Sequence, residues 1–234
     1  MRYLDLSLPT PAENLALDEA LLDEAEAAGR PVETLRTWES DCPLVILGRS
    51  SRADAEVHRD ACRRLEIPIH RRASGGAAVV VGPGCLMYAL VLSCQERPAL
   101  RAVAGAHRTV LSTIAAALAP LLPGIHCDGT SDLVLGGRKV SGNSLRAKRE
   151  HLLYHGTLLY DFPLELISEC LAMPPRRPAY RGDRPHADFL AKVPISPAAL
   201  RQALRAAWHA EEPRHDWPRA AVARLAAERY NEIA

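Results

Sequence analysis

A turn of small residues between two apolar runs constrains this chain most. Residues 71–77 read Arg-Arg-Ala-Ser-Gly-Gly-Ala, and the runs at 67–70 and 85–92 are apolar enough to be strands. Glycine lacks a Cβ, so backbone N–H groups here can approach an anion closely, and Arg71 and Arg72 add donor forks suited to carboxylate or phosphate. The stretch predicts a pocket for a charged small molecule. A plain turn with solvated arginines is the alternative.

A second stretch contains an unusual basic residue. Only three of the 29 basic residues are lysine, namely Lys139, Lys148 and Lys192. Because the chain uses arginine elsewhere, a lysine among small residues in a strand is expected to serve through its compact ammonium group. The pair Gly136-Gly137 between two apolar runs predicts a hairpin, in which Lys139 and Ser141 share one strand face. A charged residue that protects a strand edge is the alternative for Lys139.

The remaining pattern predicts an α+β domain. We expect helices at residues 11–29, 53–65, 102–122, 163–170, 197–209 and 218–231, and strands at 3–8, 32–38, 44–47, 67–70, 85–93, on both sides of the Gly-Gly pair and at 152–160. The acidic residues of the first helix are expected to form a solvated face. Strands come in pairs rather than in regular βαβ units, which favours a mixed, largely antiparallel sheet flanked by helices. Residues 1–234 are expected to form one domain with a helical tail from about residue 195.

Composition excludes several classes of protein. The formal net charge is +1, no apolar run is long enough to span a bilayer and no signal pattern opens the chain, so we expect a cytoplasmic protein that binds neither nucleic acid nor membrane. The six cysteines never form a C-x-x-C pair, which argues against a structural zinc site. Residues 173–185 contain four prolines and four arginines, which predicts an irregular loop over a site or a merely solvated one.

Four stretches, in order along the chain, resemble the lipoate–protein ligase A family within the biotin and lipoate ligase superfamily. They are Asn-Leu-Ala-Leu-Asp-Glu-Ala-Leu-Leu at 14–22, Arg-Arg-Ala-Ser-Gly-Gly at 71–76, Gly-Arg-Lys-Val-Ser-Gly at 137–142 and His-Gly-Thr-Leu-Leu at 155–159. The resemblance implies the ligase-like catalytic fold and attachment of lipoate or octanoate to a lysine of a lipoyl carrier domain. That carrier would be a dehydrogenase-complex acyltransferase subunit or the glycine-cleavage carrier protein.

The resemblance also implies roles for individual residues. Ligases of this kind make an acyl-adenylate from ATP with Mg²⁺ and then pass the acyl group to the carrier. By position, Lys139 would hold the carbonyl and phosphate oxygens, and Asp132 would lie near adenine and the metal. The implied acyl-adenylate site comprises Arg72, Ser74, Gly75, Gly76, Ala77, Ser141, Gly142, His155, Gly156 and Thr157. Adenylation places negative charge on phosphoryl and carbonyl oxygens, which an ammonium and backbone N–H groups stabilise. A turn cap at Asp132 and a core histidine at His155 are the structural alternatives.

Three departures from the family pattern leave the reaction open. Ala77 stands where the family has a third glycine, Val81-Gly82 where it has a histidine and an acid, and Ser131 where it has an asparagine. We also expect no C-terminal accessory domain of the kind that large ligases carry. Whether a separate accessory subunit assists adenylation therefore stays open.

Two other functions remain at this stage. In related octanoyltransferases a cysteine upstream of the lysine strand takes the acyl group as a thioester, without ATP. Cys127, twelve residues before Lys139, resembles that position, and a nearby cation would have to lower the pKa of its thiol. A buried strand cysteine is the structural alternative. The third function is a non-catalytic binder of lipoate, biotin or a nucleotide that has lost its chemistry at Val81 and Gly82.

Overall fold

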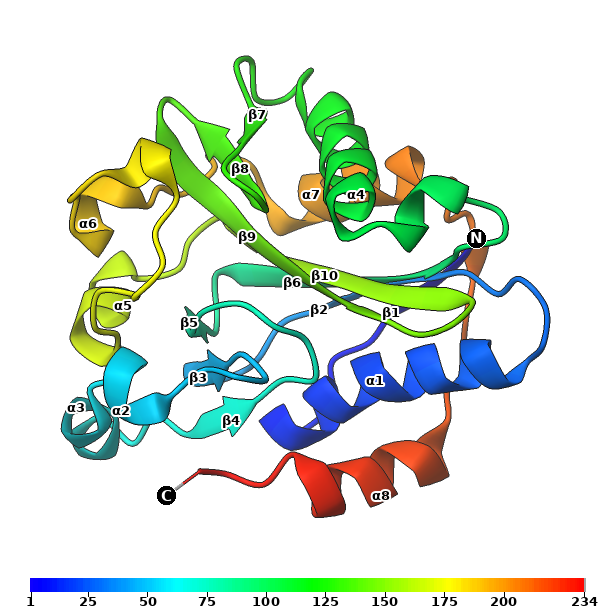
Figure 1. Cartoon of the computed structure of the whole chain (residues 1–234), viewed down its shortest axis with the longest axis horizontal. Coiled ribbons are helices and arrows are strands. Elements are labelled where there is room, and N and C mark those ends of the chain that lie inside the picture. The colour runs from blue at the N-terminus through cyan, green and yellow to red at the C-terminus, as the bar shows by residue number, and fades with distance from the viewer. Residues whose placement is uncertain (234) are drawn as a thin grey trace.

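One large sheet organises the chain in the computed structural model, which describes residues 1–233 (Figure 1). Within these residues eight strands pair in the order β11-β1-β2-β6-β10-β9-β8-β7. Their bounds are Glu212–Pro213, Arg2–Asp5, Thr34–Trp38, Cys85–Ser93, His151–Leu159, Arg138–Ala147, Asp132–Leu135 and His126–Asp128. Strand β1 runs parallel to β2 and β11, and the other neighbours are antiparallel. The predicted mixed, largely antiparallel sheet is confirmed.

A second sheet presents the Ser-Gly-Gly turn. It has the order β4-β3-β5, with β3 at Leu44–Leu47, β4 at Ile69–Arg71 and β5 at Val79–Val81. The turn connects β4 to β5, but both of these strands pair with β3 and not with each other. The residues between them therefore cross over an intervening strand instead of closing a simple hairpin.

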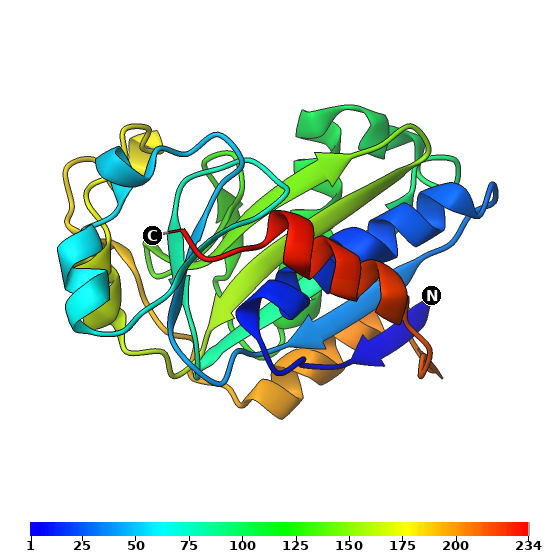
Figure 2. The same ribbon diagram turned by 90° about the horizontal axis from the view of Figure 1, so that it is seen from below.

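Helices cover both faces of the large sheet. Helices α1 (Pro11–Ala27) and α8 (Arg219–Arg229) lie side by side on one face, and α4 (Val103–Leu118) and α7 (Pro197–Ala207) lie on the other (Figures 1 and 2). Shorter helices follow around the small sheet: α2 (Ala53–Glu56), α3 (Arg59–Arg64), α5 (Leu164–Cys170) and α6 (His186–Phe189), with single 3-10 turns at Pro98–Arg101 and Ala179–Arg181. Among residues 1–233, no helix has both the length and the apolar character needed to cross a membrane.

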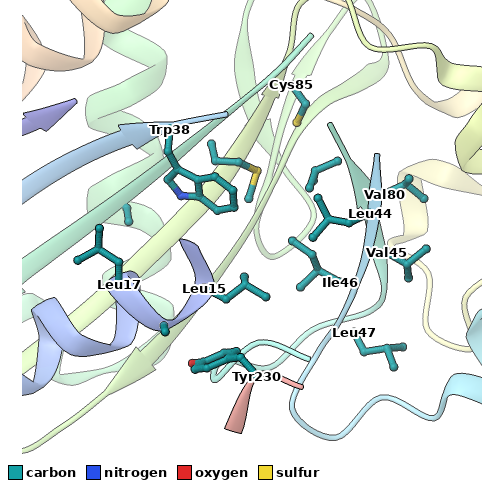
Figure 3. Packing of buried hydrophobic residues seen from close by; sticks show 14 of the residues in the cluster. Leu15, Leu17, Trp38, Leu44, Val45, Ile46, Leu47, Val80, Cys85 and Tyr230 are labelled. Carbon is teal, nitrogen blue, oxygen red and sulfur yellow. The ribbon is translucent and has the colours of Figure 1, made fainter. Parts of the chain in front are cut away.

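Each face of the sheet has its own hydrophobic core. Every residue of β6 is buried, and alternate residues belong to the two cores: Cys85, Met87, Ala89 and Val91 to one, Leu86, Tyr88, Leu90 and Leu92 to the other. Such uninterrupted apolar character is expected of a strand covered on both faces. Figure 3 shows Leu15 of α1 and Ile46 of β3 pointing toward the space between α1 and the small sheet. That space leads to the cavity described below.

The solvated acidic face predicted for the first helix is wrong. The helix begins as expected, with a capping box between Thr10 and Glu13. Asp18 and Glu19, however, are only 3% and 1% exposed. Helix α8 and the sheet enclose α1, so these two carboxylates are buried against basic partners.

Residues 195–233 are integrated into the fold. Helix α7 packs on α4 in one core, and α8 packs on α1 in the other. Strand β11 extends the large sheet, and the backbone N–H of Ile233 donates to the carbonyl of Ile69 in β4 at 2.8 Å. The segment expected to be a helical tail therefore helps to fix the strand that leads into the Ser-Gly-Gly turn.

Candidate active site

A cavity of about 360 Å³ lies between the Ser-Gly-Gly turn, strands β9 and β10 and the loop at 173–185. Its apolar lining includes Leu15, Ile46 and Met87, and its polar lining includes Lys139 and His155. A second cavity of about 140 Å³ shares Lys139, Gly142 and Thr157 with the first. The ammonium group of Lys139 therefore lies where the two cavities meet.

Arg72 holds the Ser-Gly-Gly turn from inside. Its guanidinium is buried and donates to the carbonyl oxygens of Ile46 at 3.1 Å and Ala77 at 3.0 Å, and also to that of Gly75. Burial lowers the pKa of Arg72 to about 10, which leaves it charged at neutral pH. Because most of its donors bond to the backbone, Arg72 chiefly shapes the turn.

Gly76 must be glycine for two reasons. Its φ is +90°, in the region that side chains disfavour, and a Cβ added there would meet Nη2 of Arg72 at 2.8 Å. Gly75, by contrast, would place a Cβ in open space. The close packing of Gly76 on Arg72 brings the backbone of the turn to the cavity wall.

Ser74 and His155 connect the turn to the first helix. Oγ of Ser74 lies 2.5 Å from Nε2 of His155, and Nδ1 of His155 lies 3.6 Å from Asp18. Asp18 in turn pairs with Nη1 of Arg36 at 2.6 Å, with both side chains buried. Sequence analysis missed Asp18 as a site residue, although it lies within the first family-like stretch. The signal available in the sequence was an acidic residue with leucines one helical turn before and one helical turn after it.

The Gly-Gly hairpin forms as predicted and carries Lys139 to the cavities. Gly136 and Gly137 have φ values of +58° and +72°, as a two-residue turn with both centres left-handed requires. A register shift in the β8–β9 pairing places Lys139 opposite Val134 and Ser141 opposite Leu133. Lys139 and Ser141 both line the second cavity, whereas Val140 between them is buried in the core under α4.

The ammonium group of Lys139 is held by a carboxylate. Nζ of Lys139 lies 2.8 Å from Oδ1 of Asp132, whose side chain is 8% exposed. The other oxygen, Oδ2, accepts a hydrogen bond of 2.9 Å from the hydroxyl of Tyr180. Both carboxylate oxygens are thus engaged, and within residues 1–233 no group of three His, Cys, Asp or Glu side chains gathers as metal ligands do. A Mg²⁺ ion at Asp132 would share the carboxylate with Lys139 and Tyr180, and the metal role of Asp132 stays a prediction.

Small residues make room for Lys139. A Cβ on Gly142 would stand 2.9 Å from both Cε and Nζ of Lys139. The backbone N–H of Gly142 donates to Oγ1 of Thr157 on the neighbouring strand β10 at 3.3 Å. Any larger residue at position 142 would therefore push the lysine out of its present position.

The structure brings most of the predicted site residues together. Those that line the first cavity are Arg72, Gly76, Ala77, Asp132, Lys139, Gly142, His155, Gly156 and Thr157. Ser141 lines the second cavity, while Ser74 and Gly75 of the turn line neither cavity and hold the turn in place through hydrogen bonds to His155 and Ser144. The Ser-Gly-Gly turn and the Gly-Gly hairpin, 60 residues apart, thus border one cavity.

Cys127 lies away from both cavities. It is exposed on β7, opposite Leu133 of β8, and among residues 1–233 no cysteine lines either cavity. Partial burial raises the pKa of the Cys127 thiol. In this arrangement the thiol lacks the neighbouring cation that an activated cysteine needs.

The proline-rich loop borders the site. Arg176, Arg177 and Pro178 line the first cavity, so the prediction of a loop over a site is confirmed in position. Four basic side chains line the second cavity, namely Lys139, Arg176, Arg181 and His186, and within the described part of the chain no Asp or Glu does so. This distribution of charge suits a ligand with negative charge.

A sequence model of the lipoyl protein ligase A/B catalytic domain family matches residues 10–192. The chain belongs to this family. An octanoyl-[GcvH]:protein N-octanoyltransferase of Kyrpidia tusciae is 33% identical over 168 residues, covering 64% of this chain and 57% of the relative. The octanoyltransferase LipM of Geobacillus kaustophilus is 27% identical over 216 residues, covering 82% and 76%. A probable lipoate-protein ligase A of Mycoplasma pneumoniae is 27% identical over 161 residues, covering 69% and 46%. The chain thus spans about half the length of the Kyrpidia and Mycoplasma relatives.

Solved structures of the lipoyl protein ligase A/B family share the fold. A bi-partite lipoate protein ligase from Thermoplasma acidophilum has a TM-score of 0.77 at 23% identity, covering 97% of this chain and 90% of that one. A lipoate-protein ligase A bound with ATP has a TM-score of 0.73 at 25% identity, covering 97% and 92%. The predicted ligase-like fold is confirmed. Relatives come from both the ligases and the octanoyltransferases, which are enzymes in either case, as predicted.

Proposed function

We propose that this protein attaches a lipoyl or octanoyl group to a lysine of a lipoyl carrier domain, and that it activates the acyl group with ATP as an acyl-adenylate. One observation carries the proposal. Lys139 and Gly76 line the same cavity, whose lining also includes the apolar residues Leu15, Ile46 and Met87. A cavity of this kind suits a molecule with a hydrocarbon chain at one end and a charged reacting group at the other.

The chemistry follows from where the charge develops. The acid's carboxylate oxygen attacks the α-phosphorus of ATP, and pyrophosphate leaves with the electrons of the broken P–O bond. The carrier's amine then attacks the acyl carbonyl, AMP leaves, and the nitrogen loses its proton. Negative charge grows on phosphoryl oxygens in the first step and on the carbonyl oxygen in the second. Lys139, already fixed by Asp132, stabilises both without reorganising.

Two observations favour ATP as the source of activation. Lys139, Arg176 and Arg181 line the second cavity, and their positive charges suit the phosphates of a nucleotide. A structural relative at 25% identity was solved as a lipoate-protein ligase A bound with ATP. Mg²⁺ would accompany the nucleotide and be held mainly by its phosphates, because within residues 1–233 no group of three His, Cys, Asp or Glu side chains could hold a metal ion.

A thioester route is the second candidate. It is favoured by the octanoyltransferase relatives, one of which is 33% identical to this chain. In that route the thiolate of Cys127 attacks the acyl carbonyl on one carrier, and the group that held the acyl chain on that carrier leaves. A lysine amine of another carrier then attacks the thioester, and the Cys127 thiolate leaves. Cys127 would have to move toward Lys139, because it does not line the cavity.

The test uses purified lipoyl domain, octanoate or lipoate, and ATP, each omitted in turn, with the carrier's mass as the readout. Acylation that requires ATP, together with ATP–pyrophosphate exchange, is the expected result. Chemically made lipoyl-AMP bypasses the first half-reaction, so transfer from it tests the site even where an accessory subunit is needed for adenylation. Transfer from an octanoylated carrier without ATP, with an acyl mass trapped on Cys127, would establish the second route. Ligand binding without any transfer would identify a non-catalytic binder.

A further inference from the structure

The loop at 173–185 reaches the Gly-Gly hairpin through one hydroxyl group. The hydroxyl of Tyr180 donates to Oδ2 of Asp132 at 2.9 Å, while Oδ1 of the same carboxylate lies 2.8 Å from Nζ of Lys139. The three side chains thus form a continuous chain from the loop to the junction of the two cavities. Nothing in the sequence pattern marked Tyr180.

The phenol is a permanent donor in this chain. A tyrosine keeps its proton up to a pH of about 10, so at neutral pH the hydroxyl of Tyr180 is the donor in its bond to Asp132. A protonated phenol can occupy only one carboxylate oxygen as donor, so the other oxygen is left for the ammonium. A carboxylate held in this way cannot rotate freely, and the ammonium paired with it keeps one orientation.

Other contacts hold the loop in place without the hydroxyl. The ring of Tyr180 packs on Phe189 with centroids 5.2 Å apart. Arg184 donates to the carbonyl of Gly137 at 2.9 Å and to that of Tyr180 at 2.7 Å. A change from tyrosine to phenylalanine retains the ring, so it removes the hydrogen bond to Asp132 and leaves these contacts intact.

We propose that Tyr180 is a positioning residue, whose hydroxyl fixes the Asp132 carboxylate so that Lys139 is aimed at the reacting carbonyl and phosphoryl oxygens. The inference rests on the proposed function for what Lys139 does, but not for where Lys139 lies. Tyr180 touches no reacting atom. It acts through Asp132, so removing its hydroxyl weakens catalysis only as far as Asp132 then moves.

The first arm of the test needs no activity. Only three lysines occur in the chain, so the protein labelled with ¹³C and ¹⁵N in lysine gives three sets of side-chain NMR signals, which Lys→Arg variants assign. In Tyr180→Phe the Cε and Nζ signals of Lys139 should shift, while those of Lys148 and Lys192 stay. The matched control is Tyr160→Phe. It removes a similar hydrogen bond outside the site, the one of 2.7 Å from the hydroxyl of Tyr160 to Oε2 of Glu39. Unchanged Lys139 signals in folded Tyr180→Phe would overturn the proposal.

The second arm is a double-mutant cycle on acyl transfer from lipoyl-AMP to the carrier. Tyr180→Phe should lower the single-turnover rate about tenfold, the size expected for one hydrogen bond to a charged group, with the KM for the carrier unchanged. In an Asp132→Asn background the same change should alter the rate less than about twofold, because the group that Tyr180 acts through is gone. Effects that simply multiply would overturn the proposal. A wild-type protein that transfers no acyl group fails the proposed function instead, and the NMR arm then decides on Tyr180 alone.

Discussion

Ser74 and His155, from the turn after β4 and from strand β10, lie 2.5 Å apart between Oγ and Nε2. With the imidazole proton on Nδ1, facing Asp18, the Ser74 hydroxyl donates to Nε2 and its own oxygen accepts from Nε of Arg72 at 3.1 Å. The hydrogen bonds therefore run in one direction, from the arginine of the turn through Ser74 to the imidazole on β10, whose Nδ1 lies 3.6 Å from Asp18. They connect the Ser-Gly-Gly turn to the large sheet.

Among Arg72, Ser74, His155 and Asp18, the residue whose loss should cost the most stability is Asp18. Asp18→Ala leaves the fully buried guanidinium of Arg36 without its ion-pair partner. Breaking a buried pair from one side costs about 3–5 kcal/mol, and we expect a loss of that size in the free energy of unfolding measured with urea. The control is Asp60→Ala, which removes an exposed partner of Arg63 and should cost less than about 1 kcal/mol. Equal losses in the two variants would contradict the assignment.

Gly76 offers a matched test of the turn. Gly76→Ala forces a side chain into a φ of +90° and against the guanidinium of Arg72, so we expect a loss of about 1–3 kcal/mol in unfolding free energy. Gly75→Ala places its methyl group in open space at an ordinary φ and should change stability by about 0.5 kcal/mol or less. Urea unfolding of both variants measures the difference. A destabilised Gly75→Ala with an unaffected Gly76→Ala would refute the packing described for the turn.

Local signals made the hairpin and the small-residue turn predictable. Gly136-Gly137 needs only its own two residues to specify a left-handed turn, and the lysine that follows is carried with it. The continuous apolar run of β6 and the cap of α1 at Thr10 are likewise determined by residues close in sequence. For these elements the interactions that decide the structure lie close in sequence.

The missed features depend on partners far along the chain. The local sequence predicts a solvated Glu19. In the fold its carboxylate is bound by residues more than two hundred positions later: Nη1 of Arg229 lies 2.7 Å from Oε1, and the hydroxyl of Tyr230 lies 2.5 Å from Oε2. The crossing of β4 and β5 over β3 is a long-range pairing, and Tyr180 lies in a segment without periodicity. No local pattern specifies such contacts, because the burial that creates them is a property of the assembled layers.

Lys139 should be essential for acyl transfer and dispensable for the fold. In Lys139→Ala the Asp132 carboxylate loses its cation but keeps its bond from Tyr180, so the protein should still fold, with a lower thermal unfolding temperature than the wild type. Transfer from lipoyl-AMP should fall by about 10²- to 10³-fold, the usual loss on removing a group that stabilises developing negative charge. Lys192→Ala, which removes a half-exposed partner of Asp161 elsewhere, should retain full activity. Turnover by Lys139→Ala at the wild-type rate would end the role assigned here.

His107 should make the fold sensitive to acid. Burial lowers the pKa of His107, whose Nδ1 lies 3.0 Å from the hydroxyl of Tyr154. A histidine pKa lowered in the folded state means that the unfolded chain takes up the proton first. Stability is therefore full above the unfolded pKa of about 6.5 and falls as pH drops below it. His107→Gln should flatten the fall in unfolding free energy between about pH 7.5 and pH 5.5, whereas exposed His215→Gln should not. An equally steep fall in His107→Gln would contradict this.

Cys127 separates the two candidate reactions. Cys127 is an exposed residue on β7 that lines neither cavity, and partial desolvation of its thiol by neighbouring protein atoms raises the pKa of that thiol, so at neutral pH it is a poor nucleophile where it stands. We therefore expect Cys127→Ser to acylate the carrier from lipoate and ATP at a rate within about twofold of wild type, because removing an uninvolved surface group changes little. The measurement is the carrier's mass over time, with Lys139→Ala as the inactive reference and circular dichroism as the check on folding. A folded but inactive Cys127→Ser protein would instead mean that the acyl group passes through the sulfur atom, and that β7 moves toward Lys139 to deliver it.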